Sequence, residues 1–209
     1  VHGCGFWADF ASDPALTASF DALMAAILAQ WTPWLAARAW SASQRVVDVG
    51  GGTGTLLIAL LQAHPHLRGT LVDQPATAAA AERALAAEGL STRCDVVAGS
   101  FFDPLPAGAD VYLLTSIVHD WNDTDATAIL RRCAQAAGPG GRVLLGELVG
   151  TGDEDRKLFT QMDLCMLVYL GGRERTREEF AALTEAAGLT ITSVTRSEHE
   201  YSLIDCTVR

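Results

Sequence analysis

The sequence Val46-Val47-Asp48-Val49-Gly50-Gly51-Gly52-Thr53-Gly54 carries the strongest structural signal in this chain. Its apolar start predicts a buried strand, and the glycines predict a sharp turn into a helix that begins near Thr55. Glycine lets a ligand come close to the backbone, and a side chain at Gly50, Gly52 or Gly54 would block that approach. A strand-to-helix turn without a ligand is the alternative, but four glycines in five positions weaken a fold unless something requires them.

The spacing of these glycines is G-x-G-x-G, and Asp48 precedes the first of them by two positions. Dinucleotide-binding folds prefer G-x-G-x-x-G, in which the helix N-terminus faces a pyrophosphate. The turn here is tighter and has a carboxylate beside it, which suits a ligand with a cationic end and no phosphate. S-adenosylmethionine (SAM), with its sulfonium, amino group and ribose, is such a ligand.

The composition limits the classes of protein to which the chain can belong. Its 209 residues, nearly half of them apolar, suffice for one α/β domain with a sizeable core. A net charge of −10 argues against nucleic acid and anionic membrane surfaces as partners. No basic-then-apolar signal segment opens the chain, and no run is apolar enough for a membrane helix.

The five cysteines are scattered, and no C-x-x-C pair occurs, so zinc and redox motifs are not expected. Free thiols favour a reducing compartment, and we therefore expect a cytoplasmic protein. His119 has no second histidine near it and the acidic residues form no ligand cluster, so the sequence predicts no metal site.

Two helical segments precede a region in which strands and helices alternate. Asp13-Pro14 and Thr32-Pro33 each combine a capping residue with proline, and they predict helices that end near residues 31 and 40. We accordingly divide the chain into an N-terminal helical linker segment, residues 1–40, and a main SAM-binding domain, residues 41–209.

The alternation predicts a doubly wound, mostly parallel, Rossmann-like α/β sheet of seven strands with an antiparallel last strand. A capping box at Thr176-x-x-Glu179 opens the last predicted helix. The predicted strands are 46–49, 70–73, 95–98, 111–116, 142–148, 190–195 and 201–207, and the predicted helices among them are 55–63, 76–88, 123–137, 157–168 and 176–187.

In such a sheet the ligand site lies beyond the carboxyl ends of the strands. The second strand ends in Asp73, an acid that can accept hydrogen bonds from both hydroxyls of a ribose. Ionisable or aromatic residues follow the other central strands at the same edge, namely Ser100 and Phe101 after the third, Ser116 and His119-Asp120-Trp121 after the fourth, and Glu147 at the end of the fifth.

His119 is the natural general base among these residues. An ordinary histidine titrates near pH 6.5, so we expect His119 to be largely neutral at pH 7 and able to accept a proton from a phenol. Glu147 and Glu174 could orient the imidazole and stabilise its cation. Plainer interpretations exist: a loop histidine without a role, a solvent-facing strand end at Glu147, and an ion pair between Glu174 and its flanking arginines.

Six short motifs occur in the order in which one enzyme family carries them. They are Phe6-Trp7 with Asp13-Pro14, the Asp48–Gly54 turn, Leu71-Val72-Asp73-Gln74-Pro75, His119-Asp120-Trp121-Asn122-Asp123, Pro139-Gly140-Gly141-Arg142 with Glu147, and Gly171-Gly172-Arg173-Glu174-Arg175-Thr176. On these motifs the chain resembles, over essentially its whole length, the SAM-dependent small-molecule O-methyltransferases, which include caffeic acid and polyketide-tailoring enzymes. The resemblance implies a class I SAM methyltransferase fold and methylation of a hydroxyl, expected to be phenolic, on a small aromatic or polyketide-type metabolite.

The resemblance also implies roles for individual residues. His119 matches the catalytic base of the family, and Glu147 and Glu174 match the two acids that bracket it. Met166 matches a substrate-clamping methionine, although a core methionine at helical spacing is an equal alternative. The residues expected to bind SAM are Asp48, Gly50, Gly52, Asp73, Gln74, Ser100, Phe101 and Ser116, with Asp73 on the ribose and Phe101 beside adenine; those expected to bind substrate are Trp121, Met162 and Met166.

Two departures from the family pattern stand out. Related sequences usually carry aspartate at the position of Ser100, so the adenine amino group would find a hydroxyl in place of a charged acceptor, unless Asp103 compensates. Family members also carry an N-terminal helical dimerisation domain, and this chain starts where that domain would hand over. A homodimer is therefore expected only where that domain is present.

Two alternative functions remain open from the sequence. Some relatives bind SAM and support other chemistry such as hydroxylation, but those tend to lack the histidine that this chain has at His119. A NAD(P)-dependent oxidoreductase is the weaker alternative, because the chain lacks the sixth-position glycine and a Tyr-x-x-x-Lys pair. The apolar stretch 162–170 suits an aromatic ring and equally suits a core helix.

Overall fold

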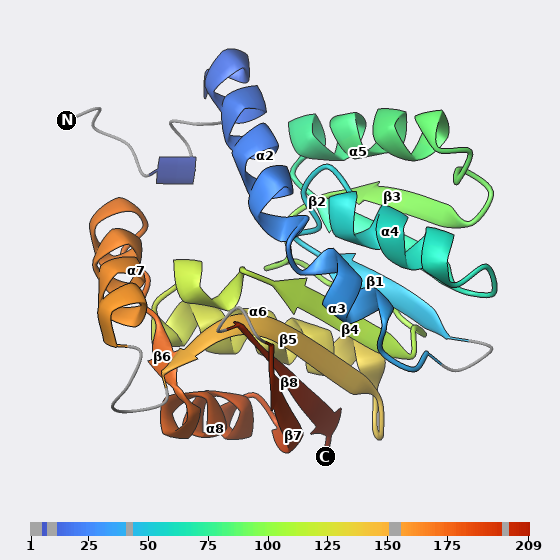
Figure 1. Cartoon of the computed structure of the whole chain (residues 1–209). Helices are drawn as coiled ribbons and strands as arrows, with labels where there is room; N and C mark the ends of the chain where they lie inside the picture. Colours follow the sequence, from blue (N-terminus) through green and yellow to red (C-terminus); the bar gives the residue numbers. More distant parts are fainter. Residues whose placement is uncertain (1–5, 8–11, 41–43, 151–155, 198–200) are drawn as a thin grey trace. The chain divides into compact units, whose positions relative to one another are not determined.

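The computed structural model describes residues 6–7, 12–40, 44–150, 156–197 and 201–209 (Figure 1). The chain separates into two compact units, Val1–Pro106 and Ala107–Arg209, which are described one at a time. The boundary predicted at residues 40 and 41 stays a prediction, since residues 41–43 lie outside the described ranges.

The first unit is a parallel sheet with its helices. Strands β1 (Arg45–Val49), β2 (Arg68–Asp73) and β3 (Cys94–Ala98) pair in the order β3-β2-β1. Helix α4 (Thr55–Ala63) packs against β2, and α5 (Pro75–Ala87) packs against β2 and β3 (Figure 1). Buried Val47, Leu57 and Leu71 are part of the core between these elements. These three strands and two helices were all predicted, each with ends within two residues of those observed.

The two N-terminal helices begin where the proline signals predicted. Helix α2 (Pro14–Leu28) is capped by Asp13, whose carboxylate accepts hydrogen bonds from the backbone N–H of Ala15 and Leu16. Both helices end earlier than expected: α2 stops at Leu28, and α3 covers only Thr32–Ala36. After each of them the chain turns with short-range backbone hydrogen bonds in place of a further helical turn.

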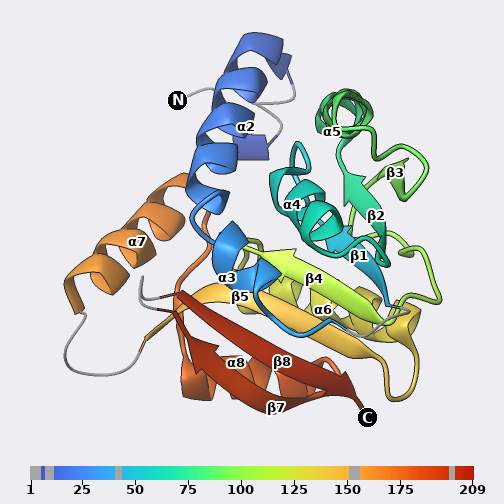
Figure 2. The ribbon, with the colours of Figure 1, turned by 45° about the vertical axis from the view of Figure 1, so that its right-hand side comes forward.

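The second unit is a mixed sheet. Strands β4 (Val111–Thr115), β5 (Arg142–Gly150), β8 (Tyr201–Val208) and β7 (Leu189–Arg196) lie in the order β4-β5-β8-β7. The β4–β5 pair is parallel, and β8 runs antiparallel to both β5 and β7, which confirms the antiparallel pairing expected for the last two strands. Figure 2 shows β7 and β8 as the two long strands next to β5.

Helices α6 (Asp123–Ala137), α7 (Arg156–Tyr169) and α8 (Arg177–Ala186) complete the second unit. Asn122 caps α6, and the predicted capping box of Thr176 and Glu179 opens α8. Two short elements were not predicted, a 3-10 helix η1 (Val118–Asp120) and a strand β6 (Arg175–Thr176) that pairs with the end of β5. The described residues thus form eight strands where seven were expected.

Within the described ranges, no helix is both long enough and apolar enough to cross a membrane.

Candidate active site

The glycine turn of the first unit follows β1 in a conformation that requires glycine. Gly50, Gly52 and Gly54 have φ angles of 71°, 59° and 87°, in the left-handed region that L side chains rarely adopt. A Cβ added to Gly51 would lie 2.8 Å from Cγ of Asp48, whereas one added to Gly52 would meet nothing within 4 Å. The turn is therefore tight on its inner side and open at Gly52, where a ligand could approach the backbone.

Two carboxylates lie at this turn. Asp73 Oδ2 accepts a hydrogen bond from Gly52 N at 2.8 Å, and Asp73 Oδ1 accepts one from Gln74 N at 2.7 Å. Burial raises the pKa of Asp73, and these two hydrogen bonds lower it in part. Asp48 is 2% exposed, and its Oδ2 has no hydrogen-bond partner among the described residues.

Burial, with the charge of Asp73 as a second cause, raises the pKa of Asp48 to about 7. A buried carboxylate oxygen without a partner is costly, because it has lost the water that would solvate it. The arrangement suits a ligand that brings a positive charge or hydrogen-bond donors to Asp48.

The loop after β3 contains the aromatic pair expected beside an adenine ring. The rings of Phe101 and Phe102 are half-buried, with their centroids 5.3 Å apart. The hydroxyl of Ser100 accepts a hydrogen bond from Phe102 N at 3.2 Å, so it stabilises its own turn. Gln74 occupies the N-cap position of α5 without a capping hydrogen bond from its exposed side chain, and Asp103 is also exposed.

In the second unit, His119 lies among three carboxylates. Its Nδ1 is 2.9 Å from Oε1 of Glu174, in a hydrogen bond, and 3.8 Å from Oε2 of Glu147. Its Nε2 is 3.4 Å from Oδ1 of Asp120. The side chain of His119 is 13% exposed, and those of Glu147 and Glu174 are 0% and 1% exposed. The structure therefore brings together the three residues that the sequence analysis proposed as a catalytic group.

Glu147 is fixed by backbone donors as well as by charge. Its Oε1 accepts hydrogen bonds from Ile117 N at 3.1 Å and from Val118 N at 2.8 Å, while Oε2 faces the imidazole. Glu147 is thus a buried acid at the site, and the alternative of a solvent-facing strand end is wrong. The alternative for Glu174 is wrong as well, since Arg173 pairs with Glu179 and Arg175 with Asp123.

The protonation state expected for His119 needs a correction. Burial lowers the pKa of His119, but the charge of Glu147, the hydrogen bond to Glu174 and the charge of Asp120 outweigh burial and raise the pKa to about 10. Burial in turn raises the pKa of Glu147 to about 7 and that of Asp120 to about 6. The three acids therefore favour the imidazolium form of His119, against the neutral imidazole expected from the ordinary pKa.

A family model described as an O-methyltransferase domain matches residues 1–190 of the chain. The chain belongs to this family. This family assignment argues against the alternative of a NAD(P)-dependent oxidoreductase.

Individual relatives agree with the family. The O-methyltransferase domain is 51% identical over 204 residues to 2,7-dihydroxy-5-methyl-1-naphthoate 7-O-methyltransferase of Streptomyces carzinostaticus, a match that covers 97% of this chain and 59% of that protein. It is 46% identical over 197 residues to aclacinomycin 10-hydroxylase RdmB of Streptomyces purpurascens, covering 92% of this chain and 52% of that protein.

Among solved structures, the chain is similar to the O-methyltransferase NcsB1 from neocarzinostatin biosynthesis in complex with SAM and 2-hydroxy-5-methyl naphthoic acid. The TM-score is 0.92 at 48% sequence identity, over 100% of this chain and 62% of that one. This likeness confirms the class I SAM methyltransferase fold predicted from the sequence. The O-methyltransferase domain spans about half to three fifths of the length of these relatives.

The remaining predicted site residues of the domain lie in the second unit. Ser116 follows β4 with a φ of 55°, the one positive φ outside glycine among the described residues. Such a conformation costs free energy in a non-glycine residue and is concentrated at functional sites. Trp121 ends η1, and Met162 and Met166 are half-buried on α7. Their roles in substrate binding stay predictions.

Sequence reasoning missed three residues around His119. Asp120 was part of a quoted motif but had no assigned role, although its carboxylate is near Nε2 of His119. Asp163 Oδ1 accepts a hydrogen bond from Glu174 N, and Arg175 donates one to the carbonyl oxygen of Val118 in the η1 turn. Like Asp120, Arg175 left a sequence signal through its place in a family motif, whereas Asp163 left none. No cluster of His, Cys, Asp and Glu within the described residues is arranged to hold a metal ion.

Proposed function

We propose that this chain is the catalytic domain of an enzyme that transfers the methyl group of SAM to a phenolic hydroxyl of a small aromatic or polyketide-type metabolite. The observation that carries the proposal is the imidazole of His119, hydrogen-bonded through Nδ1 to Glu174 and close to Glu147, in a domain of the O-methyltransferase family. S-adenosylhomocysteine would be the second product.

The first unit has the chemistry to bind SAM. The buried, unpartnered oxygen of Asp48 fits a cationic ligand, and the space at Gly52 leaves room for one. Asp73 keeps unused lone pairs on both oxygens for ribose hydroxyls, beyond the two backbone hydrogen bonds that orient it. We propose that SAM is bound by Asp48, Gly50, Gly52, Asp73, Gln74, Ser100, Phe101 and Ser116.

When bound, SAM supplies an activated methyl group, so the protein needs to orient the acceptor and take its proton. We assign the proton to Nε2 of His119, since Nδ1 is already bonded to Glu174. Glu174 and Glu147 stabilise the imidazolium that results, as the acid does in hydrolase triads. Because the same acids hold a proton on His119 beforehand, methyl transfer should speed up as the pH rises and the fraction of neutral His119 increases.

The acceptor is assigned by class only. NcsB1 is crystallised with a hydroxynaphthoic acid, and the Streptomyces carzinostaticus relative is named for a dihydroxy-naphthoate. We propose a bicyclic or larger phenolic acceptor from antibiotic-type secondary metabolism, contacted by Trp121, Met162 and Met166. We further propose a cytoplasmic enzyme, on account of its free cysteines, and a homodimer in the full-length protein.

Hydroxylation is a second candidate, because one relative at 46% identity is a hydroxylase. The presence of His119 with both acids favours methylation. The two activities differ in product mass: methylation adds a methylene unit, and hydroxylation adds an oxygen atom.

The test begins with binding of S-adenosylhomocysteine by calorimetry, followed by turnover of hydroxynaphthoic acids with SAM and mass analysis of the product. His119→Gln should bind S-adenosylhomocysteine with unchanged affinity and lose turnover by a factor of about 100 or more. Near-normal turnover in this variant would remove His119 as the base. A product heavier by oxygen alone would replace methylation with hydroxylation.

A further inference from the structure

The segment 172–175 contacts the η1 turn that carries His119 along its whole length. Arg173 N donates a hydrogen bond to the carbonyl oxygen of His119 at 2.9 Å. A Cβ added to Gly172 would lie 2.1 Å from that same oxygen, so only glycine fits at this approach. The family motif that supplies Glu174 to the imidazole therefore also packs against the backbone of the histidine.

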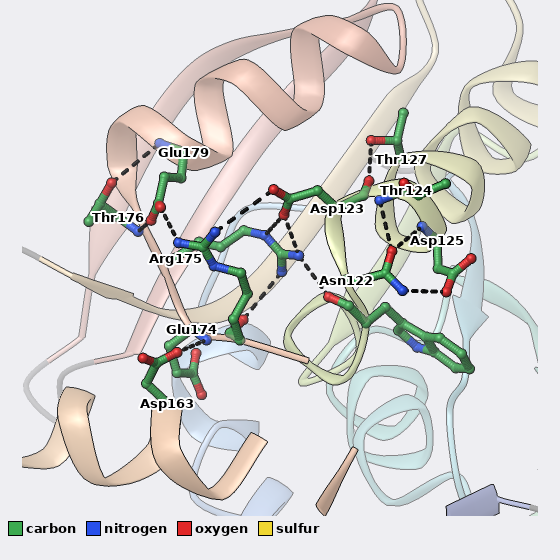
Figure 3. Close-up of polar contacts among 12 residues, drawn as sticks. Asn122, Asp123, Thr124, Asp125, Thr127, Asp163, Glu174, Arg175, Thr176 and Glu179 are labelled. Carbon is green, nitrogen blue, oxygen red and sulfur yellow. Dashed lines mark hydrogen bonds and ion pairs between the residues drawn. The ribbon is translucent and has the colours of Figure 1, made fainter. Parts of the chain in front are cut away.

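Arg175 is the centre of these contacts, and it is 1% exposed. Its guanidinium donates to the carbonyl oxygen of Val118 at 2.9 Å and to that of Trp121 at 2.7 Å, the residues that flank His119-Asp120. It also donates from Nε and from a terminal nitrogen to Oδ1 of Asp123, at 3.0 and 2.8 Å. Figure 3 shows the hydrogen bonds between Arg175, next to Glu174 in the chain, and Asp123.

The η1 turn needs such a partner. It is three residues long, and Glu147 accepts hydrogen bonds from the N–H groups of Ile117 and Val118 at its N-terminus. At its other end the turn supplies only the donor Trp121 N, 3.3 Å from the carbonyl oxygen of Val118, so further donors to the carbonyl groups at this end must come from outside. Arginine meets this demand because its planar fork has five donors in fixed directions, which a lysine cannot reproduce.

A buried cation is expensive unless several acceptors surround it. Arg175 has one carboxylate and three carbonyl oxygens as acceptors, the third being that of Arg173 in its own segment at 3.3 Å. All of them belong to η1, to the residue that follows it, to the first residue of α6 or to the segment itself. The arrangement thus fixes the distance between the histidine turn and the segment that carries Glu174.

Asp163 of α7 forms a second contact with the backbone of the same segment, at Glu174. Its Oδ1 accepts a hydrogen bond from Glu174 N at 3.0 Å (Figure 3). The position of Glu174 is consequently determined by backbone contacts, independently of its side chain.

We propose that Arg175 is a positioning residue for His119: it binds the two carbonyl groups on either side of the histidine and so keeps Nδ1 in hydrogen-bonding distance of Glu174. The proposal rests on the proposed function, in which His119 is the base. It makes no demand that Arg175 itself touch the acceptor or SAM.

The test compares Arg175→Lys and Asp123→Asn with Arg142→Lys as the control. Asp123 is 63% exposed in its side chain, so Asp123→Asn weakens the Arg175 contact at a position that tolerates substitution. Arg142 forms an ion pair of similar chemistry with Asp205, at the start of β5 and without contact to η1. Each variant is measured for thermal unfolding, affinity for S-adenosylhomocysteine, kcat of methyl transfer, and titration of His119 by NMR of histidine-labelled protein, with His119→Gln used to assign the signal.

Arg175→Lys should lower kcat about 10- to 100-fold, the cost of a base displaced by up to an ångström, with unchanged affinity for S-adenosylhomocysteine. The His119 titration should move to lower pH as the imidazole separates from its acids. Asp123→Asn should move both quantities in the same direction by less, and Arg142→Lys should move only the unfolding temperature.

Two results would overturn the proposal. One is a folded Arg175→Lys or Asp123→Asn variant whose His119 titration matches that of the wild type. The other is an equal change in the Arg142→Lys control, which would mark a general loss of stability. Because the titration requires no turnover, it decides the role of Arg175 even if the proposed methylation fails.

Discussion

Replacement of Asp48 by asparagine should change how the stability of the ligand-free chain depends on pH. Burial raises the pKa of Asp48 from 3.8 to about 7. The native state therefore binds more protons than the unfolded state between about pH 4 and pH 7, and the free energy of unfolding falls as the pH rises through this window. Asparagine is neutral at every pH, so it makes no such pH-dependent contribution to the free energy of unfolding.

The magnitude follows from the size of the change in pKa. At about 1.4 kcal/mol for each pH unit, a rise from 3.8 to about 7 corresponds to about 4 kcal/mol of destabilisation once Asp48 is ionised. The difference in unfolding free energy between Asp48→Asn and the wild type should then grow by about 3 kcal/mol between pH 5 and pH 8. The fixed cost of the asparagine amide is the same at every pH and cancels from this growth.

Urea unfolding followed by tryptophan fluorescence at several pH values between 5 and 8 measures this difference. Leu61→Met, which alters a buried apolar position of the same unit and removes no titratable group, serves as the control and should show a constant difference from the wild type. If the stability difference for Asp48→Asn stays constant across the range, Asp48 is not held at an elevated pKa. The inference that Asp48 interacts with a cationic ligand would then be wrong.

Two further predictions concern the second unit. Glu147→Gln keeps an oxygen for the N–H groups of Ile117 and Val118 but removes a charge that raises the pKa of His119. The rate of methyl transfer should therefore rise with pH over a lower pH range than in the wild type. An unshifted pH profile would exclude the charge of Glu147 as a cause of the raised pKa of His119. Gly172→Ala forces a Cβ against the backbone of the η1 turn and should cost about 1–3 kcal/mol of stability and at least about tenfold in turnover, as urea unfolding and initial rates would show. Gly99→Ala, whose Cβ would meet nothing within 4 Å, is the matched control, and equal losses in both would contradict the steric account.

The parts of the fold that the sequence predicted well are those set by local chemistry. Helices α4 and α6 have the predicted bounds, next to the glycines that precede the first and follow the second, and the capping box of Thr176 and Glu179 forms as its spacing indicates. The Asp13 cap forms for the same reason, since both partners lie within three residues along the chain. The fold class followed from the order of these elements.

The parts that could not be predicted depend on contacts between distant segments. Strand β6 is two residues long and forms because Val149 and Gly150 of β5 pair with it. No local sequence pattern predicts this pairing. The pKa of His119 is raised by acids from β5 and from the segment before β6, which are distant in sequence, so the ordinary pKa of histidine was a poor guide. The burial of Arg175 is equally non-local, because a charged residue in sequence is by default expected at the surface.

Each unit contains buried acids, and the two units differ in what opposes the effect of burial on them. In the second unit, the buried acids Glu147 and Glu174 have their counter-ion in the chain itself, namely His119. In the first unit, Asp48 has no cationic partner within the described residues, so no opposite charge offsets the rise of its pKa that burial causes. A cationic ligand that binds beside Asp48 must therefore displace its proton, whereas the proton on His119 remains with the protein. It follows that ligand binding near pH 7 should release protons to the buffer in the wild type, and that Asp48→Asn should abolish this release while His119→Gln leaves it intact.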